Sequence, residues 1–390
     1  MSSCVTQFES AFARRVRADR GFAFWKGRVA MYAILKALGV GRGDEVILPG
    51  YTCVVDVNPV EYLGARAVYA DIDPATYNAR PELIERAITP RTKVLVAQHT
   101  YGIPCEMDAY QDICRRHGIE LIEDCCHAVG STYRGKLCGT FGRAAYWSFQ
   151  WNKPFTTGIG GMATTNDPEL SRRVAEICDE QLLPPRLKPS MMLAFQRLVY
   201  WATIFPKTTA FAQSLFRWMT RKGLVVGSSM TCEIQKPEMQ PDFFTAMGPG
   251  QARAGLGKLG KLDRNIYHRK QMQRTYDALL REAGWPTVET PDYMDPVLVR
   301  YPVRVADKDR AVAQAPGRRV EIGTWFECPL HPNQTPLHLY GYEKGMCPEA
   351  EKASREVINL PTHPRAGRKT AGRSVEFIAE IGPATPPAIA

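Results

Sequence analysis

The sequence predicts an α/β fold in which helices flank a mainly parallel sheet. Between Gly27 and Thr165, short apolar runs of strand length alternate with segments whose apolar residues recur at helical spacing. This alternation is typical of strand–helix–strand units, which build parallel sheets. At 390 residues the chain also exceeds one compact core, so we expect a second, smaller domain.

Each element of this region is predicted from its own periodicity. The helices carry apolar residues three and four positions apart, whereas the strands are mostly continuous apolar runs. In chain order the predicted elements are helix Val29–Leu38, strands Glu45–Leu48 and Ala67–Ala70, helix Pro81–Ala87, strand Lys93–Ala97, helix Met107–His117, and strands Glu120–Glu123 and Ala144–Phe149. Because ligands bind at the carboxyl ends of parallel strands, Asp124 and Ser148 become candidate site residues.

A second region follows after the alternation breaks at about residue 178. A helix near Gln251–Arg281 and a strand at Val297–Val305 lead into mixed structure that extends to about Ile381. We expect these elements to form a smaller α+β domain. The predicted organisation is a large domain over 1–245 with a helical insert at about 180–240, a small domain over 246–381 and a loose Pro/Ala-rich tail over 382–390.

Composition points to an ordered protein. Hydrophobic residues make up 45% of the chain and charged residues 23%, as is ordinary for a soluble globular protein. The start does not resemble a signal peptide and no run reaches about 18 apolar residues, so we expect a cytoplasmic protein. The eleven cysteines follow neither zinc-ligand spacing nor a disulfide framework, and we expect reduced thiols and no metal.

The formal net charge of +10 is concentrated in one basic, aromatic segment, residues 186–222. This segment contains seven basic residues and no acidic ones. As a helix, it would have one apolar and one polar face. The apolar face would comprise Met192, Phe195, Val199, Ala202 and Phe205. The polar face would comprise Gln196, Tyr200, Thr203 and Lys207.

Two interpretations of this basic segment remain open. In the first, it docks on an anionic membrane surface with Trp201 and Trp218 at the depth of the headgroups, peripherally at the inner face of the membrane. In the second, it forms a helical hairpin that is buried in a dimer interface or covers an active site, because apolar helix faces are more often buried than lipid-bound. Elsewhere basic and aromatic residues do not alternate, so we expect no nucleic-acid partner.

A carboxylate and an amine at two strand ends suggest cofactor chemistry. Asp124 ends an apolar strand, where a buried carboxylate needs a cationic partner such as a protonated pyridine nitrogen. Lys153 is flanked by Trp151, Pro154 and Phe155, which would exclude water from its amine and favour the neutral nucleophile. A pyridoxal phosphate enzyme requires this pair, one group for the ring nitrogen and one for the aldehyde. The alternatives are a solvated surface lysine and an aspartate that caps a helix or turn.

Several short segments match the pattern of a known family. They are Gly43–Pro49, Tyr62–Ala65, Asp71–Asp73, His99–Gly102, Met107–Asp108, Leu121–Ala128, Ser148–Phe149, Gly158–Met162 and Thr165–Asp167. Together with Lys153 they resemble the DegT/DnrJ/EryC1/StrS aminotransferases, which are sugar aminotransferases of fold type I. The match runs nearly continuously from Gly27 to Leu170. It recurs more weakly at Gln251–Leu262, Pro329–His331 and Leu360–Pro361.

The resemblance implies a catalytic role for three residues. Lys153 would bind the aldehyde of pyridoxal 5'-phosphate covalently and later move a proton between the substrate carbon and the cofactor carbon. Asp124 would keep the pyridine nitrogen protonated. His127 would lie against the face of the ring; its alternative is a packed core imidazole.

The resemblance also implies a set of cofactor-binding residues. Ser148 would donate a hydrogen bond to the cofactor phosphate. Gly27 and Arg28, at a helix start, would offer backbone amides to the same group, and the Arg28 guanidinium could bind it bidentately. Cys53 and Asn152 occupy the remaining positions expected beside the cofactor.

Departures from the family pattern mark the chain as an atypical member. Arg28 stands where the family commonly has a hydroxyl residue, and Cys53 stands where many members stack an aromatic ring on the cofactor. The family has, near the position of Phe244, an asparagine that reaches the phosphate of the partner subunit. This chain lacks that asparagine, so Arg28 is a candidate replacement for the contact. Tyr101 and His331 are candidate substrate contacts, although His331 could equally be structural.

The function implied by the resemblance is transfer of an amino group from glutamate to a keto sugar, expected to be nucleotide-linked, by a homodimer whose active sites draw on both subunits. Relatives that dehydrate sugars have histidine in place of the lysine, so Lys153 favours amino transfer. Two alternatives remain open. One is a pyridoxal phosphate enzyme that acts on a cyclitol or another carbonyl compound or dehydrates a sugar, and the other is a non-catalytic regulator or scaffold.

Overall fold

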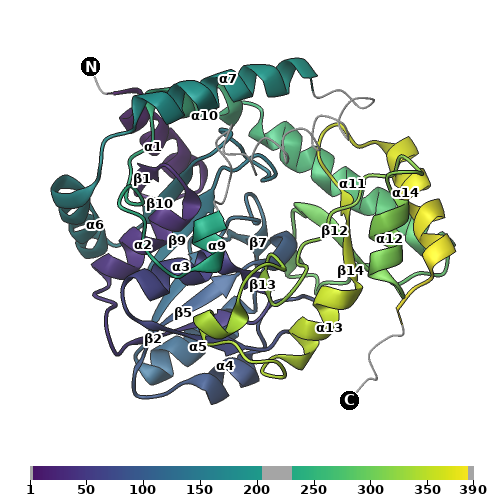
Figure 1. The fold of residues 1–390 in the computed structure, drawn as a ribbon, viewed down its shortest axis with the longest axis horizontal. Coiled ribbons are helices and arrows are strands. Elements are labelled where there is room, and N and C mark those ends of the chain that lie inside the picture. The colour runs from purple at the N-terminus through teal and green to yellow at the C-terminus, as the bar shows by residue number, and fades with distance from the viewer. Residues whose placement is uncertain (1–2, 204–230, 385–390) are drawn as a thin grey trace.

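A seven-stranded sheet forms the centre of the molecule (Figure 1). The computed structural model describes residues 3–203 and 231–384. In spatial order the strands are β1 (Arg20–Phe24), β10 (Gly161–Thr165), β9 (Ala144–Ser148), β6 (Glu120–Asp124), β5 (Thr92–Gln98), β2 (Glu45–Pro49) and β4 (Arg66–Ala70). All run in one direction except β10, which is antiparallel to both of its neighbours. The predicted α/β fold with a mainly parallel sheet is therefore confirmed.

The strands β1 and β10 are not among those predicted from the sequence, because neither is a continuous apolar run. The sequence of β10 is Gly-Met-Ala-Thr-Thr, yet all five of its residues are buried. A buried threonine hydroxyl needs a partner, and Thr164 accepts a hydrogen bond from the indole nitrogen of Trp147 on β9 (2.8 Å). Its polar residues are thus accommodated by the neighbouring strand.

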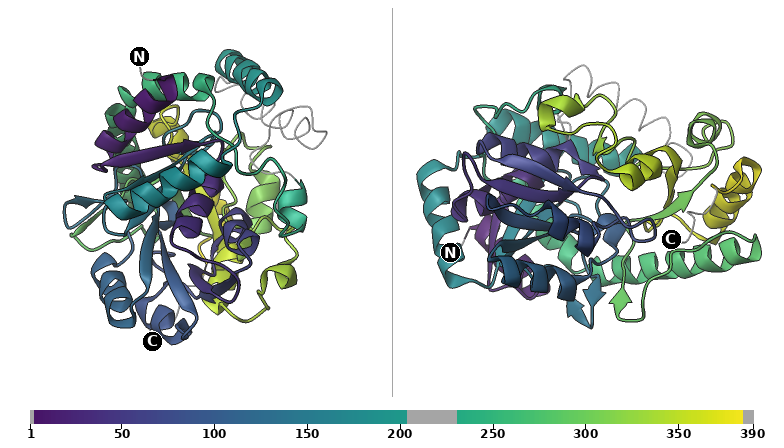
Figure 2. Two further views of the ribbon diagram at one scale, coloured as in Figure 1. Left: turned by 90° about the vertical axis from the view of Figure 1, so that its left-hand side faces the viewer. Right: turned by 90° about the horizontal axis from the view of Figure 1, so that it is seen from below.

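The parallel strands are buried on both faces, which explains their continuous apolar sequences. In β5, Val94 and Val96 join the core that contains helix α2, whereas Leu95 and Ala97 pack with residues of helix α5. Figure 2 shows helices on both sides of the sheet. The helices of this region are α1 (Cys4–Arg15), α2 (Gly27–Ala37), α3 (Val54–Tyr62), α4 (Pro81–Ala87), α5 (Met107–His117) and α6 (Pro168–Gln181).

The C-terminal part adds a two-stranded antiparallel sheet, β12 (Arg300–Arg304) and β14 (Val357–Pro361), with helices around it. These helices are α10 (Pro249–Leu259), α11 (Leu262–Glu282), α12 (Lys308–Gln314), α13 (Pro348–Glu356) and α14 (Arg368–Ile381). The predicted single helix over Gln251–Arg281 is wrong, because α10 ends at Gly260 before α11 begins. The domain boundary at 245/246 stays a prediction.

The strand predicted over Val297–Val305 is also shorter than expected. The amides of Val297 and Val299 donate to the hydroxyl of Ser131 (3.0 Å) and the carbonyl of Tyr101 (2.9 Å). These two hydrogen bonds hold Val297 and Val299 against the loops that carry Ser131 and Tyr101. Pairing of β12 with β14 therefore begins only at Arg300.

Short elements complete the described chain. Strands β3 (Thr52–Cys53) and β13 (Leu330–His331) pair in parallel. The others are β7 (Thr132–Tyr133), β8 (Lys136–Leu137), β11 (Met294–Asp295), η1 (Thr100–Gly102), η2 (Leu337–Tyr340), α7 (Leu187–Thr203) and α9 (Thr231–Gln235). Within the ranges 3–203 and 231–384, no helix is both long and apolar enough to cross a bilayer.

Part of the prediction for the basic segment lies outside the described residues. This holds for Phe205, Lys207 and Trp218, for the side chains of 201–203, and for the end of the predicted tail, 385–390.

Candidate active site

The two residues on which the site prediction rests come from neighbouring strands. Asp124 is the last residue of β6 and is buried, and its Oδ1 accepts a hydrogen bond from the amide of Cys126 (2.8 Å). Ser148 ends β9, which lies beside β6, and the chain then turns to Lys153. In this turn the amide of Lys153 donates to the carbonyl of Gln150 (3.0 Å). The parallel strands therefore bring the predicted carboxylate and amine to the same edge of the sheet.

The loop that carries Lys153 is closed by its own backbone. The amide of Phe149 donates to the carbonyl of Gly160 (2.8 Å), and the amide of Thr157 donates to the carbonyl of Phe149 (3.0 Å). A Cβ at Gly160 would lie 2.6 Å from Oγ1 of Thr157, so glycine suits this closure. Asn152 is exposed on the turn, whereas Lys153 is half-buried. The closed loop restricts where the amine of Lys153 can move.

Gly27 begins α2 directly beside the end of β9. A Cβ at Gly27 would lie 2.9 Å from Cβ of Ser148 and 3.2 Å from the carbonyl oxygen of Trp147. A Cβ at Gly161 would lie 2.5 Å from Cα of Gly27. The two glycines thus allow the N-terminus of α2 to approach Ser148, and amides at a helix N-terminus attract anions. The structure brings together these two predicted phosphate ligands.

Two cations, the partly buried Lys26 and the buried Arg28, flank Gly27 and share one carboxylate. Nζ of Lys26 lies 3.2 Å from Oε2 of Glu233, and Nη1 of Arg28 lies 3.1 Å from Oε1. Asn58 of α3 holds this part of α9 by donating to the carbonyl of Glu233 (2.8 Å). Burial lowers the pKa of Lys26, and the charge of Arg28 acts in the same direction. Arg28 therefore faces an anion, as predicted for a phosphate ligand, but here the anion is the protein's own Glu233.

His127 packs against a planar group near Lys153. Its ring and the indole of Trp325 are nearly parallel, at 11°, with centroids 5.1 Å apart, and Nζ of Lys153 lies 4.8 Å from the centroid of that indole. Nδ1 of His127 accepts a hydrogen bond from the amide of Tyr101 (3.3 Å). Burial lowers the pKa of His127 well below its usual value, and the charges of Lys153 and Arg300 add to this. The neutral imidazole thus offers a flat face to a planar ring.

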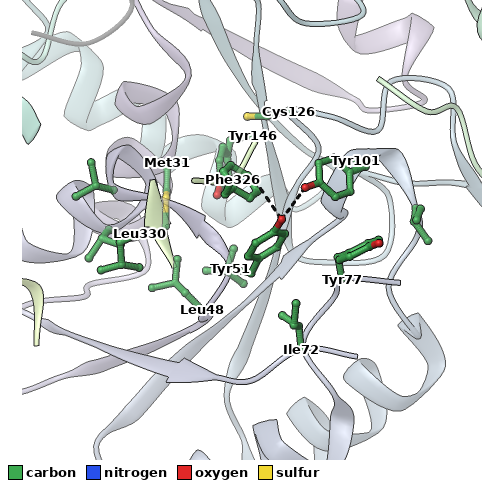
Figure 3. Packing of buried hydrophobic residues seen from close by; sticks show 14 of the residues in the cluster. Met31, Leu48, Tyr51, Ile72, Tyr77, Tyr101, Cys126, Tyr146, Phe326 and Leu330 are labelled. Atoms are coloured by element: carbon green, nitrogen blue, oxygen red, sulfur yellow. Dashed lines mark hydrogen bonds between the residues drawn. The ribbon is translucent and has the colours of Figure 1, made fainter. Parts of the chain in front are cut away.

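Tyr101 is fully buried behind this stack, within a group of aromatic residues (Figure 3). Figure 3 shows the hydroxyl of Tyr51 between Tyr101 and Phe326, with an oxygen–oxygen distance of 2.9 Å to Tyr101 and a bond of 3.2 Å from the amide of Phe326. Tyr101 also donates to the carbonyl of Trp325. The tyrosine pair therefore holds the backbone that places Trp325 beside His127. A substrate contact by Tyr101 stays a prediction.

The pairing of β3 with β13 sets Cys53 beside His331. Sγ of Cys53 donates to the carbonyl of His331 (3.4 Å). Burial raises the pKa of the Cys53 thiol to about 11 and lowers the pKa of His331 to about 4. Both side chains are therefore neutral near neutral pH, and two predicted residues from distant parts of the chain lie together.

Asp56, in the first turn of α3, belongs to the same charged cluster although the sequence did not indicate it. Burial raises the pKa of Asp56 to about 8, with the charge of Asp124 acting in the same direction and the charges of Lys153 and Arg28 opposing it. These four groups lie within electrostatic reach of one another. Glu233 and Trp325 were likewise not predicted, although Trp325 lies shortly before the family-like segment Pro329–His331.

A buried group of metal-ligand type, His99, Glu123 and Cys125, includes both chain neighbours of Asp124. Glu123 pairs with Nε2 of His99 (3.1 Å) and accepts hydrogen bonds from the amides of Gly139 (2.6 Å), Phe141 (2.7 Å) and Gly142 (2.7 Å). A carboxylate with this many donors is already satisfied. We therefore interpret it as an anchor for the end of β6.

The arrangement fits pyridoxal 5'-phosphate in four respects. Gly27 and Ser148 form a close-packed cradle at a helix N-terminus, and the carboxylate of Glu233 shows that the cations beside it accept an anion. The indole of Trp325 shows that the face of His127 accepts a planar ring. Asp124 supplies the carboxylate for the ring nitrogen, and Lys153 supplies the amine for the aldehyde.

The chain is similar to known aminotransferases over most of its length. A model of the DegT/DnrJ/EryC1/StrS aminotransferase family matches residues 2–184 and 227–379. The GDP-perosamine synthase of Caulobacter vibrioides is 42% identical over 92% of this chain and 85% of its own, and the pleiotropic regulatory protein of Geobacillus stearothermophilus is 31% identical over 97% and 89%. The X-ray structure of DesV from S. venezuelae superposes with a TM-score of 0.74 at 27% identity, covering 97% of this chain and 89% of DesV. The unmatched stretch between the two family ranges contains the basic segment 186–222.

Proposed function

The chain belongs to the DegT/DnrJ/EryC1/StrS aminotransferase family and is an aminotransferase, and we propose that it uses pyridoxal 5'-phosphate to move an amino group from glutamate to a nucleotide-linked keto sugar. The observation that carries this proposal is the convergence of Asp124, Lys153 and His127 at one edge of the sheet. The cofactor, when bound, would supply an electron sink for the substrate carbon.

Each residue of the site has a separate task in this proposal. The buried carboxylate of Asp124 stabilises a positive charge placed against it. Lys153 accepts and returns a proton. Its amine is positioned for this by the closed loop, which holds it beside the stacked rings. His127 packs without adding charge, since burial keeps it neutral.

The phosphate of the cofactor would be held at the N-terminus of α2 by the amides that follow Lys26, by Ser148 and by Arg28. Glu233 already faces both cations. An incoming phosphate would therefore share them with Glu233 or displace its carboxylate. Cys53, Asn152, Tyr101 and His331 are proposed as further cofactor or substrate contacts.

The proposed substrate class follows from the chain's similarity to a GDP-perosamine synthase. The keto group of the sugar would become an amine, and glutamate would leave as 2-oxoglutarate, so that the atoms of the exchange balance. We also propose that the enzyme is a cytoplasmic homodimer. Light scattering of the purified protein tests the dimer, and a mass of one chain at all concentrations would contradict it.

A panel assay tests the function. Purified protein is supplied with pyridoxal 5'-phosphate, glutamate and a series of GDP-, dTDP- and UDP-linked keto sugars. We expect one or more sugars to yield an amino sugar and an equal amount of 2-oxoglutarate. Lys153→Ala should abolish this, whereas Lys369→Ala, which changes an exposed lysine of α14, should not. Absence of 2-oxoglutarate with every sugar, despite bound cofactor, would overturn the proposal.

A further inference from the structure

Helix α7 presents apolar side chains to solvent. Leu187, Met191, Phe195 and Leu198 recur at helical spacing on one face and are 75%, 64%, 65% and 62% exposed. Figure 1 shows α7 along the outer edge of the molecule. Isolated exposed apolar residues are ordinary, but a continuous stripe on one helix marks an interaction surface.

The opposite face of α7 packs on the protein and mixes apolar and polar side chains, with Leu193 fully buried there. Gln196 is buried, and Nη1 of Arg197 donates to the carbonyl of Thr157 in the loop that carries Lys153 (3.4 Å). The ring of Tyr200 lies 4.8 Å from that of Trp151, and its hydroxyl accepts a hydrogen bond from Arg365 (2.9 Å). Of the predicted polar face, Gln196 and Tyr200 turn inward. Of the predicted apolar face, Phe195 and Val199 are exposed and Met192 is half-buried, and the other predicted side chains lie outside the described residues.

These contacts determine which face stays outside. A surface helix usually buries its apolar side, because that burial stabilises it. In α7 the buried Leu193, the inner hydrogen bonds and the ring contacts hold one face on the protein, so the apolar stripe on the other face remains available to another surface. The stretch between the two ranges that match the family contains this helix, so the stripe is an addition to the family's common fold.

The charge around the stripe is positive. From Leu182 to Thr203 the chain contains no acidic residue, and Lys188 is exposed within the stripe. Arg186 is paired with Asp242. Nearby, the exposed Lys258 interacts electrostatically with Arg197 and Lys261, so the positive charge extends to the neighbouring helix. An apolar stripe with basic surroundings complements an anionic, partly apolar surface.

A second copy of the chain is a poorer occupant. In a twofold contact the same patch meets itself, so Lys188 and the basic residues around it would approach those of the other copy. Like charges brought together at an interface oppose association. Lipid headgroups of opposite sign impose no such cost.

We propose that the outer face of α7 docks this aminotransferase on an anionic lipid bilayer, with Leu187, Met191, Phe195 and Leu198 entering the headgroup layer and Lys188 contacting lipid phosphates. The helix lies parallel to the surface, as an interfacial helix does. The inner contacts then connect the docked helix to the loop of Lys153. This role goes beyond amino transfer and does not depend on it.

Vesicle flotation of the full chain tests the proposal. The probes are phosphatidylcholine vesicles with and without phosphatidylglycerol. We expect the protein to float with the anionic vesicles only, and to be released by salt, because electrostatic attraction is screened. The triple variant L187S/M191S/F195S should bind at least about tenfold more weakly, since three apolar side chains no longer enter the lipid.

The matched control is the double variant L339S/M346S, which changes two apolar residues that are 44% exposed elsewhere on the surface. It should float like the unchanged protein. Equal flotation of the triple variant, or no flotation with anionic vesicles, would overturn the proposal. So would a triple variant that is monomeric where the unchanged protein is dimeric, because the stripe would then be a contact between copies. Circular dichroism of each variant confirms that it is folded.

Discussion

Asp56 and Asp124 bring two carboxyl groups into one small, partly buried site. Burial disfavours the ionised form of Asp56, and the negative charge of Asp124 acts in the same direction. The pKa of Asp56 is raised to about 8, so Asp56 carries the proton while Asp124 is the group assigned to the ring nitrogen. One carboxylate can therefore serve the cofactor without a second negative charge beside it.

The raised pKa of Asp56 predicts a pH dependence of stability. A carboxyl whose pKa rises on folding binds its proton more tightly in the folded state, so it stabilises the fold at low pH. This contribution should be lost as pH rises from the ordinary value of 3.8 to about 8. Denaturant unfolding of the protein without cofactor, repeated across this range, should give a steeper loss of stability for the unchanged protein than for Asp56→Asn.

The control is Asp309→Asn, which changes an exposed aspartate in α12. It should retain the pH dependence of the unchanged protein. If Asp56→Asn also retains it, Asp56 does not hold its proton in the folded state.

At the scale of elements, the first turn of α2 depends on a glycine. Gly27→Ala would put a Cβ 2.9 Å from that of Ser148, and the overlap should cost about 1–3 kcal/mol of unfolding free energy. Because the same contact forms the cradle, cofactor affinity should fall as well. Denaturant unfolding and an absorbance titration with pyridoxal 5'-phosphate measure the two effects.

Gly257→Ala supplies a matched control in α10, where an added Cβ would meet no atom within 4 Å. It should leave cofactor affinity unchanged and stabilise the helix by about 0.5–1 kcal/mol. Unchanged affinity in Gly27→Ala would remove the N-terminus of α2 from the phosphate site.

Helix α7 is expected to restrain the loop of Lys153 through Tyr200. Tyr200→Ala removes the ring contact with Trp151 and the hydrogen bond from Arg365, so amide hydrogen exchange over 151–158 should accelerate. Tyr200→Phe keeps the ring contact and should have a smaller effect. Phe195→Ala, on the exposed face, should have none. Equal exchange in all three variants would show that α7 does not restrain the loop.

For the whole molecule, sequence patterns predict the parallel strands of the large sheet but few of the elements around them. The five parallel strands from β2 to β9 are apolar runs because both of their faces are buried, so their sequences reveal them. The residues Asp124 and Lys153 are recognisable because they follow such strands. The polar strand β10 and the edge strand β1 contain no such continuous apolar run.

The remaining part of the site could not be predicted because it is assembled from distant segments. Glu233 approaches Lys26 across 207 positions of the chain, and Trp325 lies on His127. Neither contact has a local pattern, since tertiary packing alone creates it. Periodicity predicts that α7 is amphipathic, but which of its side chains turn outward depends on partners such as Trp151 and Arg365.

Lys153 is proposed to be the residue that holds the cofactor. Purified protein with pyridoxal 5'-phosphate should show a visible absorbance band that disappears on borohydride reduction. Mass spectrometry of the digested protein should then find one reduced pyridoxyl group, on Lys153. A label on another lysine, such as Lys26, or the absence of any label would show that Lys153 does not hold the cofactor.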